Sequence, residues 1–174
     1  MPNLVTLRAD IQPDDLSRMM NWMANEHVYR YLNEHQQINV QLKQVYDARL
    51  PVLTPLFNRN GRFLMICTGG GQAIGFLRMA HAANNSAEIV IAIGDESIWG
   101  KGYGRSSLSE ALKIAFFDMR KERVIAHIYN ENRRSQRLFE NHGFAPQSAG
   151  EHMTKYELTL HDYLHPDDEK SKIA

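Results

Sequence analysis

One glycine-rich stretch constrains the fold of this chain more than any other feature. Ile98 to Arg105 reads Ile-Trp-Gly-Lys-Gly-Tyr-Gly-Arg, between the apolar run Ile89–Ile93 and a helical pattern that starts near Ser106. Glycine has no Cβ, so each glycine can adopt a positive φ and let a ligand approach main-chain N–H groups. A helix that begins directly after such a loop offers unpaired N–H donors and the positive end of its dipole. The stretch predicts a phosphate-binding turn between a strand and a helix, although such a turn can also serve only to reverse the chain.

Two common phosphate-binding motifs do not match this stretch. A P-loop closes with Lys-Ser or Lys-Thr, whereas Gly104 is followed by Arg105 and Ser106. A dinucleotide fingerprint reads GxGxxG, whereas Gly100, Gly102 and Gly104 read GxGxG. The surrounding pattern must therefore identify the ligand.

The chain has the size of one domain, which we place at residues 1–165, before a charged tail at 166–174 that is expected to be disordered. Its 20 acidic side chains balance 20 basic ones, which argues against nucleic-acid binding. No apolar run approaches the roughly 18 residues of a membrane span, and no signal-peptide pattern opens the chain, so we expect a cytoplasmic protein without membrane contact. Cys67 ends an apolar segment and is expected to be buried. His161 and His165 lack an obvious third ligand, so no metal is expected.

Hydrophobic periodicity predicts an α/β (α+β) chain. Strands are expected at Leu4–Leu7, Arg62–Cys67, Ala73–Ala80, Ala87–Gly94, Arg123–Tyr129 and Met153–Leu160. Helices are expected from Pro13, across Val40–Phe57 with a break or kink at Pro51 and Pro55, from Ser106, and over Arg133–Asn141. A helix between Ala87–Gly94 and Arg123–Tyr129 makes these strands parallel neighbours, with a ligand expected at their carboxyl ends. The segment Ala145–Glu151 is interpreted as a short connection, which favours an open cleft.

Two segments together resemble the GNAT N-acetyltransferase superfamily. Gly94–Arg105 looks like its motif A, and Asn132–Phe144, with Asn-x-x-Ser before a short helix and Gly-Phe, looks like its motif B. Trp99 makes the loop similar to the RimJ/RimL-type branch, the ribosomal-protein N-acetyltransferases. The resemblance implies a single-domain GNAT fold, in which a mixed and mostly antiparallel sheet is flanked by helices and splayed between its fourth and fifth strands. These strands would be Ala87–Gly94 and Arg123–Tyr129.

The same resemblance implies a site for acetyl-CoA as cosubstrate. Backbone groups of Ile91 and Ile93 would pair with the pantetheine arm, the glycine loop would hold the pyrophosphate, and Asn132 and Ser135 would approach the thiol end. The predicted cofactor-binding residues are Ile91, Ala92, Ile93, Trp99, Gly100, Lys101, Gly102, Tyr103, Gly104, Arg105, Asn132 and Ser135.

Acetyl transfer to an amine needs a base, an oxyanion partner and a proton for the departing thiolate. Glu88 is the only ionisable residue within Ala87–Gly94 and is predicted to be the base, although it could equally be a solvated carboxylate at the strand. A backbone N–H of Ile91 or Ala92 would meet the oxyanion. Many family members have a tyrosine donor where this chain has Phe139, so Ser135 is the favoured proton donor.

Several alternatives stay open at this stage. Tyr129 or water could replace Ser135, which could instead support its helix. His127 and His142 are less favoured, because isolated histidines are more often packed or exposed.

The predicted function is therefore transfer of an acetyl group from acetyl-CoA to a primary amine, by direct attack in a ternary complex. The acceptor would be a protein or peptide N-terminus or a small amine, contacted by Trp22, Tyr31 and Glu88, and the chain would be a monomer or homodimer. Trp22 and Tyr31 could instead fill the core. The alternative function is a non-catalytic CoA-binding sensor. It stays open because Phe139 stands where many family members have a proton-donating tyrosine.

Overall fold

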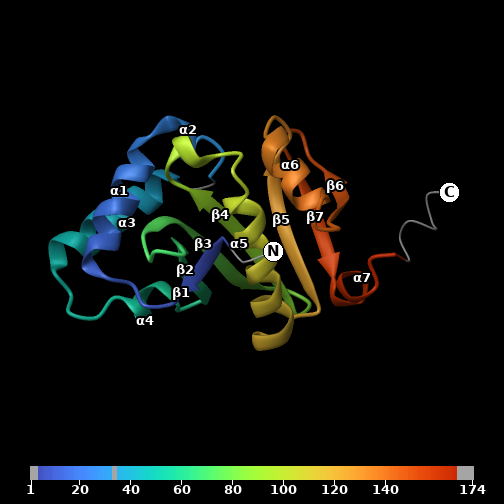
Figure 1. Ribbon diagram of the computed structural model, residues 1–174, viewed down its shortest axis with the longest axis horizontal. Helices are drawn as coiled ribbons and strands as arrows, with labels where there is room; N and C mark the ends of the chain where they lie inside the picture. Colours follow the sequence, from blue (N-terminus) through green and yellow to red (C-terminus); the bar gives the residue numbers. More distant parts are fainter. Residues whose placement is uncertain (1–3, 33–34, 168–174) are drawn as a thin grey trace. The chain divides into compact units, whose positions relative to one another are not determined.

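The computed structural model describes residues 4–32 and 35–167 and shows a seven-stranded mixed sheet with flanking helices (Figure 1). The strands are β1 (Val5–Arg8), β2 (Gly61–Thr68), β3 (Ala73–Ala82), β4 (Ser86–Ile93), β5 (Arg123–Tyr129), β6 (Ala145–Ala149) and β7 (Met153–Thr159). The helices are α1 (Pro13–Ala24), α2 (Glu26–Tyr29), α3 (His35–Ala48), α4 (Thr54–Phe57), α5 (Tyr103–Lys113), α6 (Arg133–Glu140) and α7 (Leu160–Leu164), with a 3₁₀ turn η1 (Glu96–Ile98) and a π-helical turn η2 (Ile114–Asp118). Most of the tail predicted at 166–174 lies outside the described residues.

The strand order is β1-β2-β3-β4-β5-β7-β6, so β4 lies in the middle of the sheet. The predicted parallel neighbours are confirmed, because β4 pairs with β5 in the register Ser86↔Arg123, Ala87↔Val124 and Glu88↔Ile125. The pairs β1–β2, β5–β7 and β6–β7 are antiparallel. A tight turn, in which Thr68 N–H donates to the Gln72 carbonyl, joins β2 to its neighbour β3. The mixed and mostly antiparallel sheet matches the expected fold class, while a splay between β4 and β5 stays a prediction.

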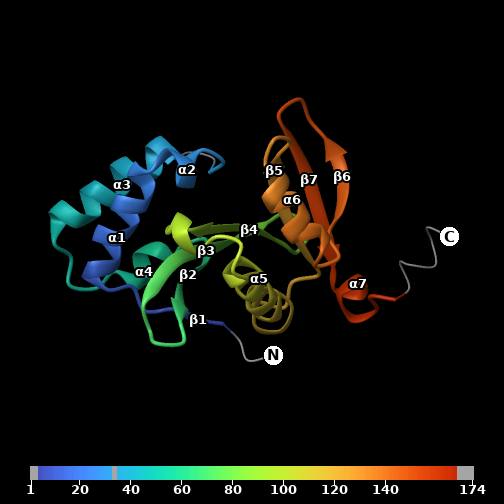
Figure 2. The same ribbon diagram turned by 45° about the horizontal axis from the view of Figure 1, so that its top comes forward.

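The chain divides into two compact units, the first of which comprises Met1–Arg78 and Val90–Ser107. In this unit α1 and α3 lie side by side (Figure 2) and their apolar faces join strand residues in one core. Its fully buried members include Met19, Met23 and Met65, and Cys67 is buried as expected. The start of α1 is fixed by Asp15, which accepts the Gln12 N–H at 2.8 Å.

The helix predicted across Val40–Phe57 is two helices. α3 ends at Ala48, Arg49 takes a positive φ of 47°, and α4 begins only at Thr54. Pro51 explains the interruption, because its ring and missing N–H prevent the helix from continuing through it.

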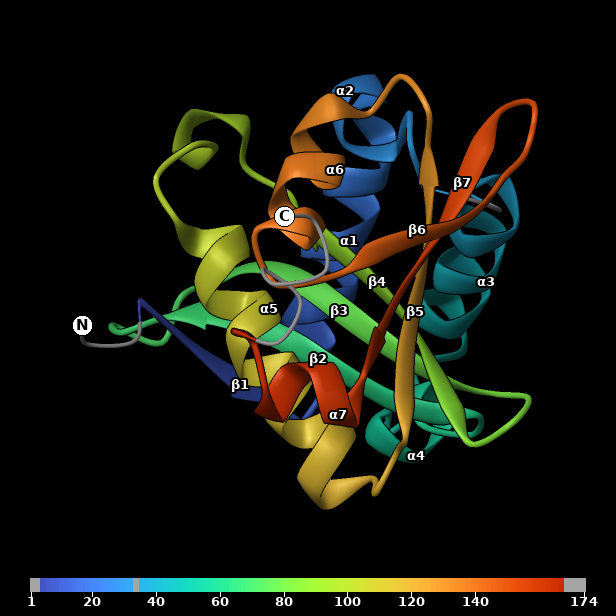
Figure 3. The same cartoon turned by 90° about the vertical axis from the view of Figure 1, so that its right-hand side faces the viewer.

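The second unit comprises Met79–Ile89 and Leu108–Ala174. Strands β5 and β7 bury one face through Val124, Ala126, Tyr156 and Leu158. Helix α6 lies on this face, where Tyr156 donates to Glu140, and its Phe139 is also buried. Figure 3 shows β6 and β7 as a hairpin beside β5, with α7 directly after β7. No helix among the described residues has both the length and the apolarity of a membrane span.

Three local predictions in this part of the chain were wrong or incomplete. Ala145–Ala149 is a strand and not merely a connection; its Ala-Pro-Gln-Ser-Ala sequence has low β-propensity, but at the sheet edge Pro146 needs no ladder donor. The helix predicted from Ser106 begins at Tyr103 and passes into the π-helical turn Ile114–Asp118. Helix α7 was missed, because the strand pattern ends in only one helical turn.

Candidate active site

The glycine loop presents backbone donors at the start of α5. Gly100 and Gly102 have φ of 77° and 90°, values that side chains with a Cβ rarely adopt, whereas Gly104 lies within the first turn of α5. Only two of the three glycines therefore meet the expected need for a positive φ. The first α5 bond is donated by Ser106 N–H to the Gly102 carbonyl at 3.0 Å, so the N–H groups from Tyr103 to Arg105 precede it. They are the orphan donors that a helix start offers to an anion.

Trp99 fastens this loop to the end of β4. Its indole Nε1–H donates to the Ile93 carbonyl at 2.9 Å. The predicted pairing of a pantetheine arm with Ile93 must therefore share this oxygen or use the Ile93 N–H. The intervening turn η1 is capped by Asp95, whose Oδ1 accepts the Ser97 hydroxyl at 2.7 Å and the Ser97 N–H at 2.9 Å. These two hydrogen bonds hold the pKa of Asp95 below its ordinary value.

Trp22 also lies close to the end of β4, against Gly94. A Cβ placed on Gly94 would sit 2.2 Å from two atoms of the Trp22 ring, so only glycine leaves room for the indole. Asn25 Nδ2, just beyond α1, donates to Glu96 Oε1 in η1. Both contacts lie within the first unit. Trp22 is thus partly buried against the core, in the packing role left open above, and its contact with an acceptor stays a prediction.

Tyr31 follows α2 and is half-buried. The guanidinium carbon of Arg30 lies 5.3 Å from the centroid of the Tyr31 ring, within cation–π range. Its role as an acceptor contact stays a prediction.

Glu88 forms a pair with His127 in the second unit. Glu88 Oε1 lies 2.9 Å from His127 Nδ1, and the two side chains are 34% and 37% exposed. Glu88 opposes Ile125 in the parallel register, and His127 lies two residues further along β5 on the same face. The carboxylate is therefore neither isolated nor merely solvated. Sequence reasoning missed the partner, since only the strand register brings the two residues together.

Charged side chains surround this pair on β5 and β7. Lys155 lies directly opposite His127 in the antiparallel register. Glu157 accepts two ion pairs, from Lys155 Nζ at 3.8 Å and from Arg123 Nε at 3.7 Å. Arg123, Ile125 and His127 share one face of β5, and the opposite face, with Ala126 opposite Tyr156, lies toward α6, where the Tyr156 hydroxyl donates to Glu140. The pair thus lies on a polar, solvent-accessible face of the sheet.

Asn132 and Ser135 hold the turn between β5 and α6. Asn132 is the N-cap residue, and its Oδ1 accepts the Ser135 N–H at 3.2 Å while its Nδ2 donates to Ser135 Oγ at 3.0 Å. The buried Gln136 amide donates to the carbonyls of Tyr129 and Asn130 at 3.3 and 3.0 Å. Helix support is thus a demonstrated role of Ser135, and proton donation to a thiolate stays a prediction.

Phe139 is a core residue of the second unit. It is 5% exposed and packs edge-on against Phe144, with ring centroids 4.9 Å apart. The nearby buried hydroxyl is that of Tyr156, which donates to Glu140 Oε1 at 3.3 Å. Burial raises the pKa of Tyr156, and the Glu140 charge raises it further. A neutral Tyr156 is therefore favoured in the fold.

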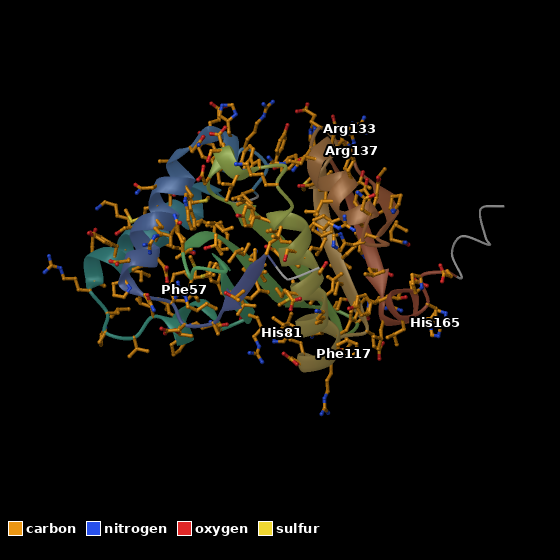
Figure 4. All side chains as sticks on the ribbon, viewed as in Figure 1. Phe57, His81, Phe117, Arg133, Arg137 and His165 are labelled. Atoms are coloured by element: carbon orange, nitrogen blue, oxygen red, sulfur yellow. The ribbon has the colours of Figure 1, made fainter. Side chains whose placement is uncertain are left out.

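The exposed basic side chains of α6 include Arg133 and Arg137 (Figure 4). Arg133 Nη1 donates to Gln136 Oε1 at 3.1 Å, so this guanidinium helps to hold the turn after β5. In residues 4–32 and 35–167, no cluster of three or more His, Cys, Asp and Glu side chains could hold a metal ion.

The predicted site residues fall in both units. Trp22, Tyr31, Ile91 and the glycine loop through Arg105 belong to the first unit, and Glu88, Asn132 and Ser135 belong to the second. Within each unit the structure brings Trp22 and Trp99 to the end of β4, Glu88 to His127, and Asn132 to Ser135.

Residues 5–145 match the family described as an acetyltransferase (GNAT) domain. YwnH of Bacillus subtilis, provisionally named a phosphinothricin acetyltransferase, is 45% identical over 64 residues, which are 37% of this chain and 38% of YwnH. MJ1062 of Methanocaldococcus jannaschii, described as uncharacterized, is 27% identical over 152 residues, which are 86% of this chain and 30% of MJ1062. The matches therefore span well under half of either relative.

The fold is similar to that of spermidine N-acetyltransferase from Vibrio cholerae in complex with CoA and spermine, with a TM-score of 0.70, 18% identity, and 92% and 98% of the two chains covered. A dodecameric structure of that enzyme gives a TM-score of 0.72 and 20% identity over 94% and 98% of the chains. At these identities the similarity shows the fold alone. The family match, which covers most of this chain, shows more: the chain belongs to the GNAT acetyltransferase family.

Proposed function

We propose that this protein transfers an acetyl group from acetyl-CoA to a primary amine, by direct attack within a ternary complex. The observation that supports catalysis over mere CoA binding is the hydrogen-bonded Glu88–His127 pair. Glu88 lies three residues before Ile91 in the same strand, which is about 10 Å along β4. A binding module needs no acid–base pair near its ligand, whereas acetyl transfer to an amine needs a base that takes a proton from the acceptor nitrogen.

The backbone supplies the other contacts of the proposed site. The N–H groups at the start of α5 would hold the pyrophosphate, and an N–H of Ile91 or Ala92 would meet the oxyanion. The acceptor nitrogen forms the new C–N bond, the C–S bond breaks, and the thiolate takes a proton, for which Ser135 is the proposed donor. The hydrogen-bonded Glu88–His127 pair takes the proton of the acceptor nitrogen, and solvent returns a proton to Ser135.

The acceptor class is a small amine or a protein N-terminus. The relatives with acceptors in their names, in Bacillus subtilis and Vibrio cholerae, favour a small amine. Trp99 and its glycine loop favour the RimJ/RimL-type branch and hence an N-terminus. We propose a cytoplasmic monomer or homodimer, to be tested against the dodecamer known for the Vibrio cholerae enzyme.

The test is an acceptor screen that measures thiol release from acetyl-CoA with polyamines, amino acids and N-terminal peptides. We expect turnover with at least one amine, and about a 10²-fold or greater loss in Glu88→Gln. Glu151→Gln is the matched control, because the Glu151 side chain is 88% exposed in the β6–β7 connection. Tight binding of acetyl-CoA without turnover of any amine would instead support the sensor.

A further inference from the structure

We propose that His127, not Glu88, takes the proton from the acceptor amine. Glu88 is then the positioning residue, which orients the imidazole ring and stabilises its protonated form. The proposal rests on the acetyltransferase function proposed above. In a mechanism with Glu88 as the base, loss of Glu88 would harm turnover more than loss of His127. The present proposal expects the reverse.

The hydrogen bond fixes which imidazole nitrogen is available. An ionised carboxylate only accepts, so Glu88 Oε1 at 2.9 Å requires a proton on His127 Nδ1. A neutral imidazole with Nδ1–H carries its lone pair on Nε2. In the part of the chain that the structure describes, no hydrogen bond to Nε2 is recorded, and the side chain is 37% exposed. His127 therefore presents a basic nitrogen to solvent while Glu88 is already engaged.

The pair is built into the second unit by strand register. Glu88 opposes Ile125, and alternation along β5 places His127 on the same face. On its other side, His127 opposes Lys155 of β7. The Lys155 ammonium disfavours an imidazolium, but Glu157 lies 3.8 Å from Lys155 Nζ and partly neutralises it, while Arg123 shares the same carboxylate. Within residues 4–32 and 35–167, Glu88 is thus the one carboxylate hydrogen-bonded directly to the ring.

The chemistry favours this division of roles. Imidazole is better matched than a carboxylate to proton transfer near neutral pH. As the amine nitrogen bonds to the acetyl carbon and the C–S electrons leave on sulfur, the nitrogen proton moves to His127 Nε2. The resulting imidazolium is stabilised by the Glu88 carboxylate through Nδ1–H, as in carboxylate–histidine pairs of hydrolases. Release of the Nε2 proton to solvent restores the base.

Two variants separate the roles. His127→Asn retains an amide N–H near the Nδ1 position, which keeps a donor for Glu88 but removes the basic nitrogen. Glu88→Gln retains a carbonyl oxygen that accepts from Nδ1 but removes the charge. We expect His127→Asn to lower kcat by about 10²-fold or more with CoA affinity unchanged. We expect Glu88→Gln to lower kcat by a smaller factor than His127→Asn does, because the basic nitrogen remains while the carboxylate that stabilises the imidazolium is lost.

His152→Asn, on a side chain that is 78% exposed, is the control and should leave kcat unchanged. An active wild type whose His127→Asn variant keeps wild-type kcat, or a larger loss in Glu88→Gln than in His127→Asn, would overturn the proposal. An inactive wild type that binds CoA would instead refute the proposed function. Nitrogen-15 NMR of the imidazole gives a readout without turnover: we expect the Nδ1–H tautomer, and an Nε2–H tautomer would contradict the assignment.

Discussion

Replacing Gly94 by alanine should force the Trp22 indole away from the end of β4. The added Cβ would lie 2.2 Å from the Cγ and Cδ2 atoms of Trp22 and 2.3 Å from Cδ1. Carbon atoms in contact are normally about 3.5–4.0 Å apart, so the ring must withdraw by more than about 1 Å. Overpacking of this kind costs about 1–3 kcal/mol, because neighbouring side chains must leave their preferred rotamers. For a chain of this length we expect Tm to fall by about 3–10 °C.

Urea and thermal unfolding of Gly94→Ala measure this loss, and Gly69→Ala is the matched control. A Cβ on Gly69 meets nothing within 4 Å, and the residue has no positive φ. The control should therefore stay within about 0.5 kcal/mol of wild type. In a Trp22→Ala background the ring is gone, so Gly94→Ala should cost much less than in wild type. Equal stability of Gly94→Ala and Gly69→Ala, or full additivity with Trp22→Ala, would refute the assigned contact.

Four further outcomes follow from the contacts described. Asp15→Asn should lower the free energy of unfolding by about 2–3 kcal/mol, measured with urea, because the fully buried Asp15 accepts two hydrogen bonds from Arg8 at 3.0 Å. The partial exposure of Arg8 to water keeps the loss from being larger. The stability advantage of wild type over Tyr156→Phe should shrink as pH rises above about 10, because the unfolded tyrosine ionises there while the pKa of folded Tyr156 is higher. Asn132→Ala should lose about 1 kcal/mol of cap energy, measured by thermal unfolding, and Asn132→Asp should retain most of it. Trp99→Phe should weaken CoA binding about fivefold by calorimetry, since it removes the bond to the Ile93 carbonyl; unchanged affinity would show that this bond does not position the loop.

Local patterns predicted the central part of the fold well. Apolar alternation placed β5 at Arg123–Tyr129 with the bounds that the structure shows, and the glycine stretch correctly separated β4 from α5. The failures occurred where the apolar pattern gives no signal, or where tertiary contacts outweigh propensity. Tyr103 starts α5 earlier than the apolar pattern indicates, because its first turn is made of residues that bury little. Ala145–Ala149 forms an edge strand because it pairs with β7 through backbone hydrogen bonds, whereas its own sequence has low β-propensity.

In the candidate site, too, the features of a single strand could be predicted from sequence, whereas the contacts between strands could not. Glu88 could be chosen from sequence because it is the only ionisable residue in an apolar strand, and the alternation of Val124, Ala126 and Ile128 indicates which face of β5 is buried. This alternation places His127 on the other face, but it does not say which residue of β4 lies beside it. A register shifted by one residue would move the histidine to the opposite face of the sheet from Glu88. Glu88 and His127 are 39 positions apart in the chain, with the crossover helix α5 between them, so no local sequence pattern fixes their register. The acid–base pair is therefore a property of the folded sheet, and a variant that shifts β5 by one residue should abolish it while leaving both side chains in the sequence.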